Sequence, residues 1–162
     1  MKPIITPEES SRLDAAAVES VETLMERAGL GVALAAVREG AAYGKRVMLL
    51  AGPGNNGGDA YVAARYLHRR GVAAEVRALG YPRGDGAPAR VMGAAAVHAG
   101  VPVAPLDRPE PCDLIVDGLF GAGFRGTLPD RAAGWIDHPA PVVSVELPSG
   151  LRGGDGSVEG TA

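Results

Sequence analysis

The chain has 162 residues, of which 46% are hydrophobic, and a formal net charge of −3. This length is enough to bury a real core and favours a single domain, while the lack of any Lys/Arg block argues against a nucleic-acid-binding or anionic-membrane-binding surface. The single cysteine, Cys112, excludes an internal disulfide, and without a signal segment or a membrane-spanning apolar run we expect a cytoplasmic protein.

Two helices are predicted before the first strand. The run Thr6-Pro7-Glu8-Glu9 has the form of a helix start with a capping box. A second helix follows Ser20, because apolar residues then recur at helical spacing until Gly40. The unbroken apolar run over 46–51 predicts a strand that is buried on both faces.

Helices and strands then alternate to the end of the chain. The expected elements are a helix that ends at Gly71, a strand over 73–79, a helix over 87–99, a strand over 113–120, a helix near 131–136 and a strand over 142–147. Such alternation is typical of βαβ units. We therefore expect an α/β protein with a doubly wound, largely parallel sheet and helices on both faces.

Three of the predicted strands end in loops rich in glycine and polar residues, at 52–59, 117–126 and 146–150. In an open parallel sheet, ligands bind outside the carboxyl ends of the strands, and these ends share one edge. We therefore expect the three loops to converge on one site. The strand over 73–79 ends without a comparable motif.

Residues 52–59 read Gly-Pro-Gly-Asn-Asn-Gly-Gly-Asp and precede a helix. Backbone N–H groups of such a loop favour phosphate, although a plain strand-to-helix turn is the alternative. The glycines satisfy the weak pattern G-x-G-x-x-G, but Asp59 would set a negative charge against pyrophosphate and no carboxylate ends the second strand. A standard dinucleotide site is therefore disfavoured, and the lack of G-K-[ST] excludes an ordinary P-loop.

Asp117 follows the apolar run 114–116, so its carboxylate is expected to be buried. A buried carboxylate needs a partner, a cation or a proton, which leaves two interpretations open: an acid/base or metal role, or a cap for nearby N–H groups. Arg125 with the glycines of its loop suggests a second anion cradle or a solvated surface charge. Glu146 either holds a sugar hydroxyl or belongs to a turn.

Four motifs in this order carry a family resemblance. They are Leu-Met-Glu-Arg-Ala-Gly at 24–29, the loop at 52–59 with Arg65, Val-Asp-Gly-Leu-Phe-Gly at 116–121, and Val-Glu-Leu-Pro-Ser-Gly at 145–150. Together they resemble the YjeF N-terminal domain, the NAD(P)HX epimerases, across nearly the whole chain.

The resemblance implies a Rossmann-like fold and an epimerase that interconverts the R and S forms of hydrated NADH or NADPH (NADHX, NADPHX). It implies a functional partner, an ADP/ATP-dependent dehydratase that is fused to this domain in many bacteria, and leaves a homodimer open. Family members continue beyond the last motif, so we expect one domain over 1–162 that is truncated at its carboxyl end. A non-catalytic nucleotide-binding or scaffold module of the same fold is the alternative.

The resemblance also implies the site. One potassium ion per subunit is expected at Asn56, Asp117 and Ser149, and our mechanistic hypothesis is that Asp117 is catalytic and moves protons on and off the C6 hydroxyl. The phosphates would rest on loop N–H groups and Arg125. The implied substrate-binding residues are Asn55, Asn56, Gly57, Gly58, Asp59, Gly121, Ala122, Gly123, Phe124, Arg125, Gly126, Thr127 and Glu146.

Three positions depart from the residues usual in the family. Ala60 stands where the family usually has Gly, Gly118 where it usually has Ala, and Glu146 where it usually has Asp. Glutamate keeps the charge but adds a methylene. We therefore expect its carboxylate to be displaced relative to a ribose hydroxyl.

Overall fold

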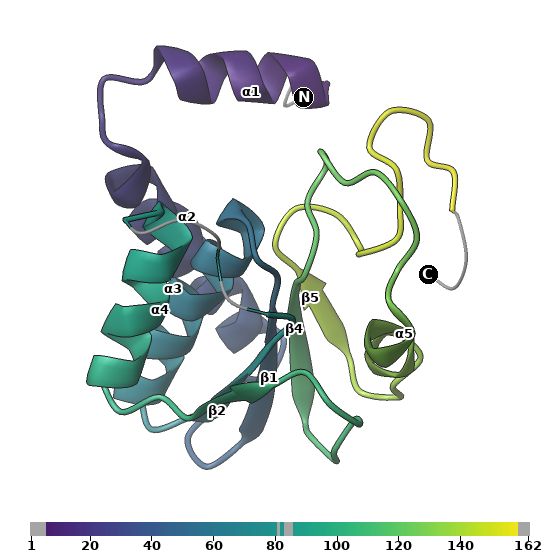
Figure 1. Cartoon of the computed structure of the whole chain (residues 1–162). Helices are drawn as coiled ribbons and strands as arrows, with labels where there is room; N and C mark the ends of the chain where they lie inside the picture. Colours follow the sequence, from purple (N-terminus) through teal and green to yellow (C-terminus); the bar gives the residue numbers. More distant parts are fainter. Residues whose placement is uncertain (1–5, 81, 83–85, 159–162) are drawn as a thin grey trace.

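A five-stranded parallel sheet forms the centre of the molecule in a computed structural model, which describes residues 6–80, 82 and 86–158 (Figure 1). The strands are β1 (Arg46–Ala51), β2 (Ala73–Ala78), β3 (Val103–Pro105), β4 (Leu114–Gly118) and β5 (Val142–Ser144). Their order is β3-β2-β1-β4-β5, and every neighbouring pair is parallel. The order reverses between β1 and β4, which is where such sheets bind ligands.

The helices are α1 (Pro7–Ala16), α2 (Val21–Arg38), α3 (Asn55–Arg69), α4 (Pro88–His98) and α5 (Asp130–Ile136). In Figure 1, α2, α3 and α4 cover one face of the sheet, α5 lies on the other, and α1 stands apart across the top of the molecule. The α/β fold with a parallel sheet and helices on both faces is therefore confirmed. No helix in the described ranges combines the length and apolarity needed to cross a bilayer.

The predicted starts of the first two helices are confirmed. In α1, Thr6 Oγ1 accepts from Glu9 N at 3.2 Å while Thr6 N donates to Glu9 Oε2 at 2.7 Å, which is the reciprocal capping box. In α2, Ser20 Oγ accepts from Thr23 N at 3.3 Å. Each cap satisfies a backbone N–H that has no partner inside its helix.

The central strands divide the core into two layers because they are buried on both faces. Val47, Leu49 and Val116 pack towards α2, α3 and α4. Met48 and Leu50 lie in the other layer, which includes the fully buried Trp135 of α5 and otherwise consists of Leu79, Leu106, Ile115, Leu119, Leu128 and Ala132. The unbroken apolar run of β1 is therefore a consequence of burial from both sides.

The strand β4 ends at Gly118, two residues before the end of the strand expected over 113–120, and two strands differ more strongly from the sequence-based expectation. The strand β3 was not predicted, because it has only three residues and ends in Pro105. The last strand was expected over 142–147 but ends at Ser144. Val145 N still donates to Asp117 O at 2.9 Å, after which the chain turns so that Ser149 can reach the Asp117 side chain.

The loop expected over 52–59 is shorter than predicted, because α3 already begins at Asn55. Only residues 52–54 connect β1 to the helix. A side chain at Gly57 would collide with the carbonyl oxygen of Gly52, and one at Gly58 would collide with the sulfur of Met25. Glycine is therefore needed here for close packing inside a helix, and not only for the conformation of a loop.

Gly118 on β4 and Ala60 on α3 face each other across the helix–sheet contact. A Cβ at position 118 would lie 2.7 Å from Ala60 Cβ and 2.9 Å from the Asn56 carbonyl oxygen. The family's usual pair, Gly at 60 and Ala at 118, would put one methyl group into the same space from the opposite side. Positions 60 and 118 therefore share one contact, in which this chain carries its methyl group on the helix.

We expect Gly118→Ala alone to lower the free energy of unfolding by about 1–3 kcal/mol, because it adds a second methyl group to a filled contact. Ala60→Gly alone should cost about 0.5–1 kcal/mol through helix propensity. The double variant should be more stable than Gly118→Ala. Urea unfolding of the four proteins in a double-mutant cycle measures this coupling, and strictly additive effects would contradict it.

Candidate functional site

The three polar loops meet at one edge of the sheet, as predicted from the shared strand direction. Gly52 N donates to Gly118 O at 3.0 Å, which joins the loop after β1 to the end of β4. Ala122 N donates to Glu146 Oε2 at 2.9 Å, which joins the loop after β4 to the loop after β5. The edge is therefore a single assembly and not three separate turns.

Asp117 and Ser149 form the buried centre of this assembly, and each is only 1% exposed. Asp117 Oδ1 accepts from Ser149 Oγ at 2.6 Å and from Leu119 N at 3.2 Å, and Oδ2 accepts from Ser149 N at 2.7 Å. Burial raises the pKa of the Asp117 carboxyl, and these hydrogen bonds oppose the rise. The capping interpretation of Asp117 is thus realised in the structure.

The side chain of Asn56 is buried in the first turn of α3 without a hydrogen-bond partner. Neither its Oδ1 nor its Nδ2 has one in the described part of the chain. Leaving a buried amide unsatisfied costs about 1–3 kcal/mol, so a ligand or ion that supplied a partner would be favoured. Oδ1 faces the loop after β4, where a Cβ at Gly121 would lie 3.4 Å from it.

The donor chemistry of Asn56, Asp117 and Ser149 suits a hard cation, because it consists of amide, carboxylate and hydroxyl oxygens. Among the described residues, no three His, Cys, Asp or Glu side chains are grouped so that they could hold a metal ion. An oxygen-binding alkali ion therefore fits this edge better than a transition metal.

Glu146 extends from the loop after β5 across the backbone of the loop after β4. Its Oε2 accepts from Ala122 N, and a side chain at Gly121 would collide with the same carboxylate oxygen. The longer side chain of glutamate, compared with the aspartate usual in the family, is used to reach this second loop. Gly121 in turn leaves room for the carboxylate in this position.

Two hollows open beside Asn56 and Glu146, and both residues line both hollows. The first, which we call the glycine-loop cavity, has a volume of about 430 Å³. The amino terminus of α3 opens there without a side-chain cap, so its first N–H groups favour an anion. Its other lining residues are Pro53, Gly54, Asn55, Leu119, Phe120, Gly121, Gly123 and Phe124.

The second hollow, which we call the helix cavity, has a volume of about 450 Å³ and lies between α1, α2 and α3. It combines polar residues of α1 and α3 with apolar residues of α2. Besides Asn56 and Glu146, its lining consists of Ser10, Asp14, Ala15, Val21, Leu24, Met25, Ala28, Asn55 and Asp59. No chemical pattern in the sequence indicated the α1 residues, whereas Leu24, Met25 and Ala28 belong to the motif at 24–29.

Three carboxylates face this helix cavity, from Asp14, Asp59 and Glu146. The pKa of Asp59 is raised to about 7, first by burial and then by the negative charges of Glu146 and Asp14. Asp59 therefore exchanges a proton near neutral pH. A carboxylate with such a pKa in a cleft is typical of a functional site.

The motif at 24–29 places α2 close against α3. Glu26 forms a half-buried ion pair with Arg65, and a side chain at Gly29 would collide with Val62. Met25 fills the space beside Gly58. The first and second family motifs are therefore two sides of one helix–helix contact that also forms a wall of the helix cavity.

The structure brings most of the predicted substrate-binding residues to the two cavities, but not all of them. Gly57 and Gly58 are packed inside α3 and line neither cavity. Ala122 contributes a backbone N–H to Glu146, and exposed Arg125 donates to Phe124 O at 2.9 Å. Gly126 and Thr127 are exposed and lie outside both linings.

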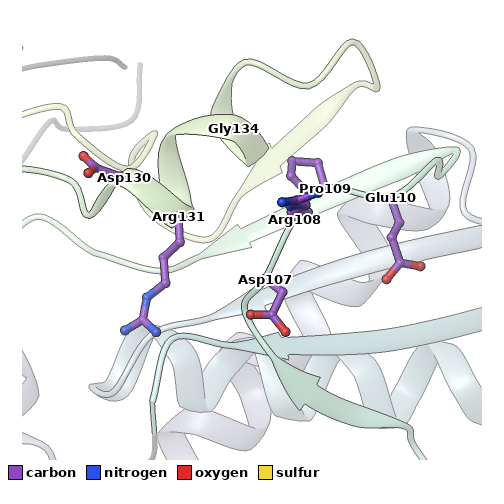
Figure 2. Close-up of a pocket in the computed structure, with 7 residues that line it drawn as sticks. All are labelled: Asp107, Arg108, Pro109, Glu110, Asp130, Arg131 and Gly134. Atoms are coloured by element: carbon purple, nitrogen blue, oxygen red, sulfur yellow. The ribbon is translucent and has the colours of Figure 1, made fainter.

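A larger hollow, of about 560 Å³, lies away from this edge between the β3–β4 connection and α5. Figure 2 shows acidic and arginine side chains from both segments around it. The connection is fixed there because Trp135 Nε1 donates to Asp107 O at 2.8 Å, and Glu110 pairs with Arg46 and Arg77 at 2.6 Å each. We regard this hollow as a packing seam, since its charges are mixed in sign.

Comparison with known proteins identifies relatives over nearly the whole described chain. Residues 21–162 match the family model described as YjeF-related protein N-terminus. A solved crystal structure of the yeast protein ynu0 (YNL200c) superposes with a TM-score of 0.76 and 27% identity, covering 93% of this chain and 72% of the yeast chain.

Several relatives carry the name NAD(P)H-hydrate epimerase. The protein of Oenococcus oeni is 35% identical, over 86% of this chain and 69% of its own length, and that of Limosilactobacillus reuteri is 32% identical, over 98% and 79%. A bifunctional NAD(P)H-hydrate repair enzyme of Pyrobaculum aerophilum is 38% identical. The chain covers 86% of its own length in that match but spans only 30% of the bifunctional relative.

The raised pKa of Asp59 predicts a pH-dependent stability effect. The carboxyl of Asp59 loses its proton near pH 3.8 in the unfolded chain and near pH 7 in the folded one. Its contribution to the free energy of unfolding therefore falls as pH rises between these values. Asp59→Asn should abolish that fall. Above pH 7 in potassium-free buffer it should be more stable than the unmodified protein by about 1–3 kcal/mol, after allowing for screening at the cavity mouth.

Urea unfolding over a pH series measures this difference. Asp155→Asn is the control, because hydrogen bonds from Ser157 lower the pKa of Asp155 and its replacement should have the opposite sign. Equal pH profiles for Asp59→Asn and the unmodified protein would contradict the prediction.

Proposed function

Because this chain belongs to the family of YjeF-related protein N-termini, we propose that it is an NAD(P)H-hydrate epimerase. The observation that carries the proposal is the junction of the two cavities, where Asn56, whose amide is buried and unsatisfied among the described residues, and Glu146 line both hollows. Two relatives with that name align with this chain over more than two thirds of their own lengths.

The proposed substrate is NADHX or NADPHX, in which water has added across a double bond of the nicotinamide ring. Epimerisation requires the C6 hydroxyl to leave and to return on the other face of the ring. We assign the diphosphate to the glycine-loop cavity, because the amino terminus of α3 opens there without a side-chain cap and favours an anion. Arg125 is exposed on the loop after β4, outside the lining of this cavity, and adds a positive charge to that loop.

We further propose one potassium ion held by Asn56, Asp117 and Ser149. The fit rests on the two unsatisfied polar atoms of Asn56 and on the burial of the Asp117 charge. When bound, such an ion offsets the cost of that buried charge and attracts substrate oxygens.

The catalytic role of Asp117 stays a prediction. Its carboxylate lines neither cavity, and its oxygens already accept hydrogen bonds from Ser149 and Leu119. This geometry supports a role in holding the cation and the loops more directly than proton exchange with substrate. The experiment below tests whether the reaction needs Asp117.

Other expectations extend the proposal. We propose that residues 1–162 form one epimerase domain. Its S product would pass to a nucleotide-driven dehydratase, and the name of the bifunctional relative from Pyrobaculum aerophilum supports such a partner.

We expect potassium to stabilise the protein against heat, because an ion that binds only the folded state adds stability by mass action. Near saturation the melting temperature should rise by about 5–10 °C relative to sodium at equal ionic strength. Asn56→Leu should remove the difference because it deletes the amide oxygen. Leu34→Phe, on an exposed part of α2, is the matched control and should retain it.

Scanning calorimetry in potassium and sodium buffers measures these shifts without reference to activity. An equal response to both ions in the unmodified protein would refute the cation site.

The epimerase proposal is tested with mixed NADHX epimers and an S-specific dehydratase. The protein should accelerate consumption of the R form, which without an epimerase is consumed only as fast as it epimerises spontaneously. Asp117→Asn should abolish the acceleration, because the site loses a negative charge and the new amide N–H₂ faces the donors of Ser149.

Circular dichroism and thermal unfolding of Asp117→Asn serve as the folding control. No acceleration by the unmodified protein in potassium buffer would refute the function. Full activity of Asp117→Asn would remove Asp117 from the mechanism.

A further inference from the structure

The helix cavity contains residues of α1 and α2 that no predicted role accounts for. Its α2 wall is apolar and consists of Val21, Leu24, Met25 and Ala28, and α1 faces it with Ser10, Asp14 and Ala15. Such a wall suits the carbon face of a ring, because the contact removes apolar surface from water without a polar penalty.

The polar side of the helix cavity is acidic. Asp14, Asp59 and Glu146 come from three different segments and all line it, while no lysine or arginine is among the lining residues in the part of the chain that the structure describes. A diphosphate would be repelled by this arrangement, whereas uncharged groups with N–H or O–H donors would be bound, since ionised carboxylates only accept hydrogen bonds. The helix cavity, with three carboxylates against one in the glycine-loop cavity, is therefore the less favourable of the two for the charged middle of a dinucleotide.

The position of the helix cavity also restricts its occupant. It meets the glycine-loop cavity at Asn56 and Glu146, which line both. A dinucleotide with its diphosphate in the glycine-loop cavity would place one of its two ring ends in the helix cavity.

We propose that the helix cavity binds the hydrated nicotinamide ring of the substrate and that Asp14 of α1 is part of this subsite. This inference rests on the proposed epimerase function. The hydrated ring offers two donor groups, its carboxamide N–H₂ and its C6 hydroxyl, which match the acidic side. Adenine has one donor, its amino group, but its ring nitrogens are acceptors, for which the three carboxylates offer no donors when ionised.

The raised pKa of Asp59 supports the assignment to the reacting ring. A group that gains and loses a proton near pH 7 is suited to a hydroxyl that must leave and return, and it has no comparable use beside adenine. The charged groups that face Asp59 are Asp14 from α1 and Glu146 from the loop after β5.

The test compares two ligands that differ only by the ring. NADHX contains the hydrated nicotinamide, and ADP-ribose is the same molecule without it. Ala28→Phe adds a bulky side chain at an exposed helix position that lines the helix cavity, so it fills the subsite with little effect on the core. Leu34→Phe is the matched control, because it adds the same ring to α2 at a position that is 39% exposed and lines neither cavity.

Isothermal titration calorimetry should show that Ala28→Phe raises the Kd for NADHX at least about tenfold, which corresponds to 1.4 kcal/mol, and leaves the Kd for ADP-ribose within about twofold. Leu34→Phe should change neither. Asp14→Asn, a conservative change on exposed α1, should weaken NADHX several-fold and spare ADP-ribose. It keeps the test decisive if Ala28→Phe does not fold.

Two results would overturn the proposal. An unchanged Kd for NADHX in both cavity variants would show that the ring lies elsewhere. Equal weakening of NADHX and ADP-ribose would show that the helix cavity receives the adenine end. If the unmodified protein binds neither ligand, the proposed function fails instead, so the two failures are distinguishable.

Discussion

The buried carboxylate of Asp117 is the constraint on which the rest of the site depends. Its three hydrogen bonds, two from Ser149 and one from Leu119, fix the loops after β4 and β5 to each other at the sheet edge. A charge in this position must be compensated, and the neighbouring amide of Asn56 is left without a partner by the same packing. The hydrogen bonds of Asp117 therefore fix the polar edge, while the amide of Asn56 leaves one position there where an ion or ligand can bind.

Close backbone contact makes this arrangement possible. The start of α3 lies against Gly52 and Met25 because Gly57 and Gly58 have no side chains, and Glu146 crosses Gly121 for the same reason. The glycines of the motifs thus determine distances between segments as much as loop conformation. Two cavities of different character result. The glycine-loop cavity contains the uncapped amino terminus of α3, and the helix cavity combines an apolar face of α2 with three acidic residues.

Much of the fold could be predicted from the sequence because its signals are local. The capping box at Thr6 and the apolar run of β1 each indicated an element directly, and the shared direction of parallel strands predicted that the loops would meet. The strand β3 is held by its neighbour and is too short for a pattern. Asp14 could not be assigned, because its place beside Asp59 depends on how α1 lies across the sheet edge.

The contact between Ala60 and Gly118 restricts the order in which relatives can have diverged. One methyl group fits between α3 and β4, so Ala at both positions overfills the space. Gly at both positions leaves only a small void and a helix residue of lower propensity, which a marginally stable domain tolerates more readily. A lineage that moves the methyl group from the strand to the helix would therefore pass more readily through the double-glycine state than through the double-alanine state.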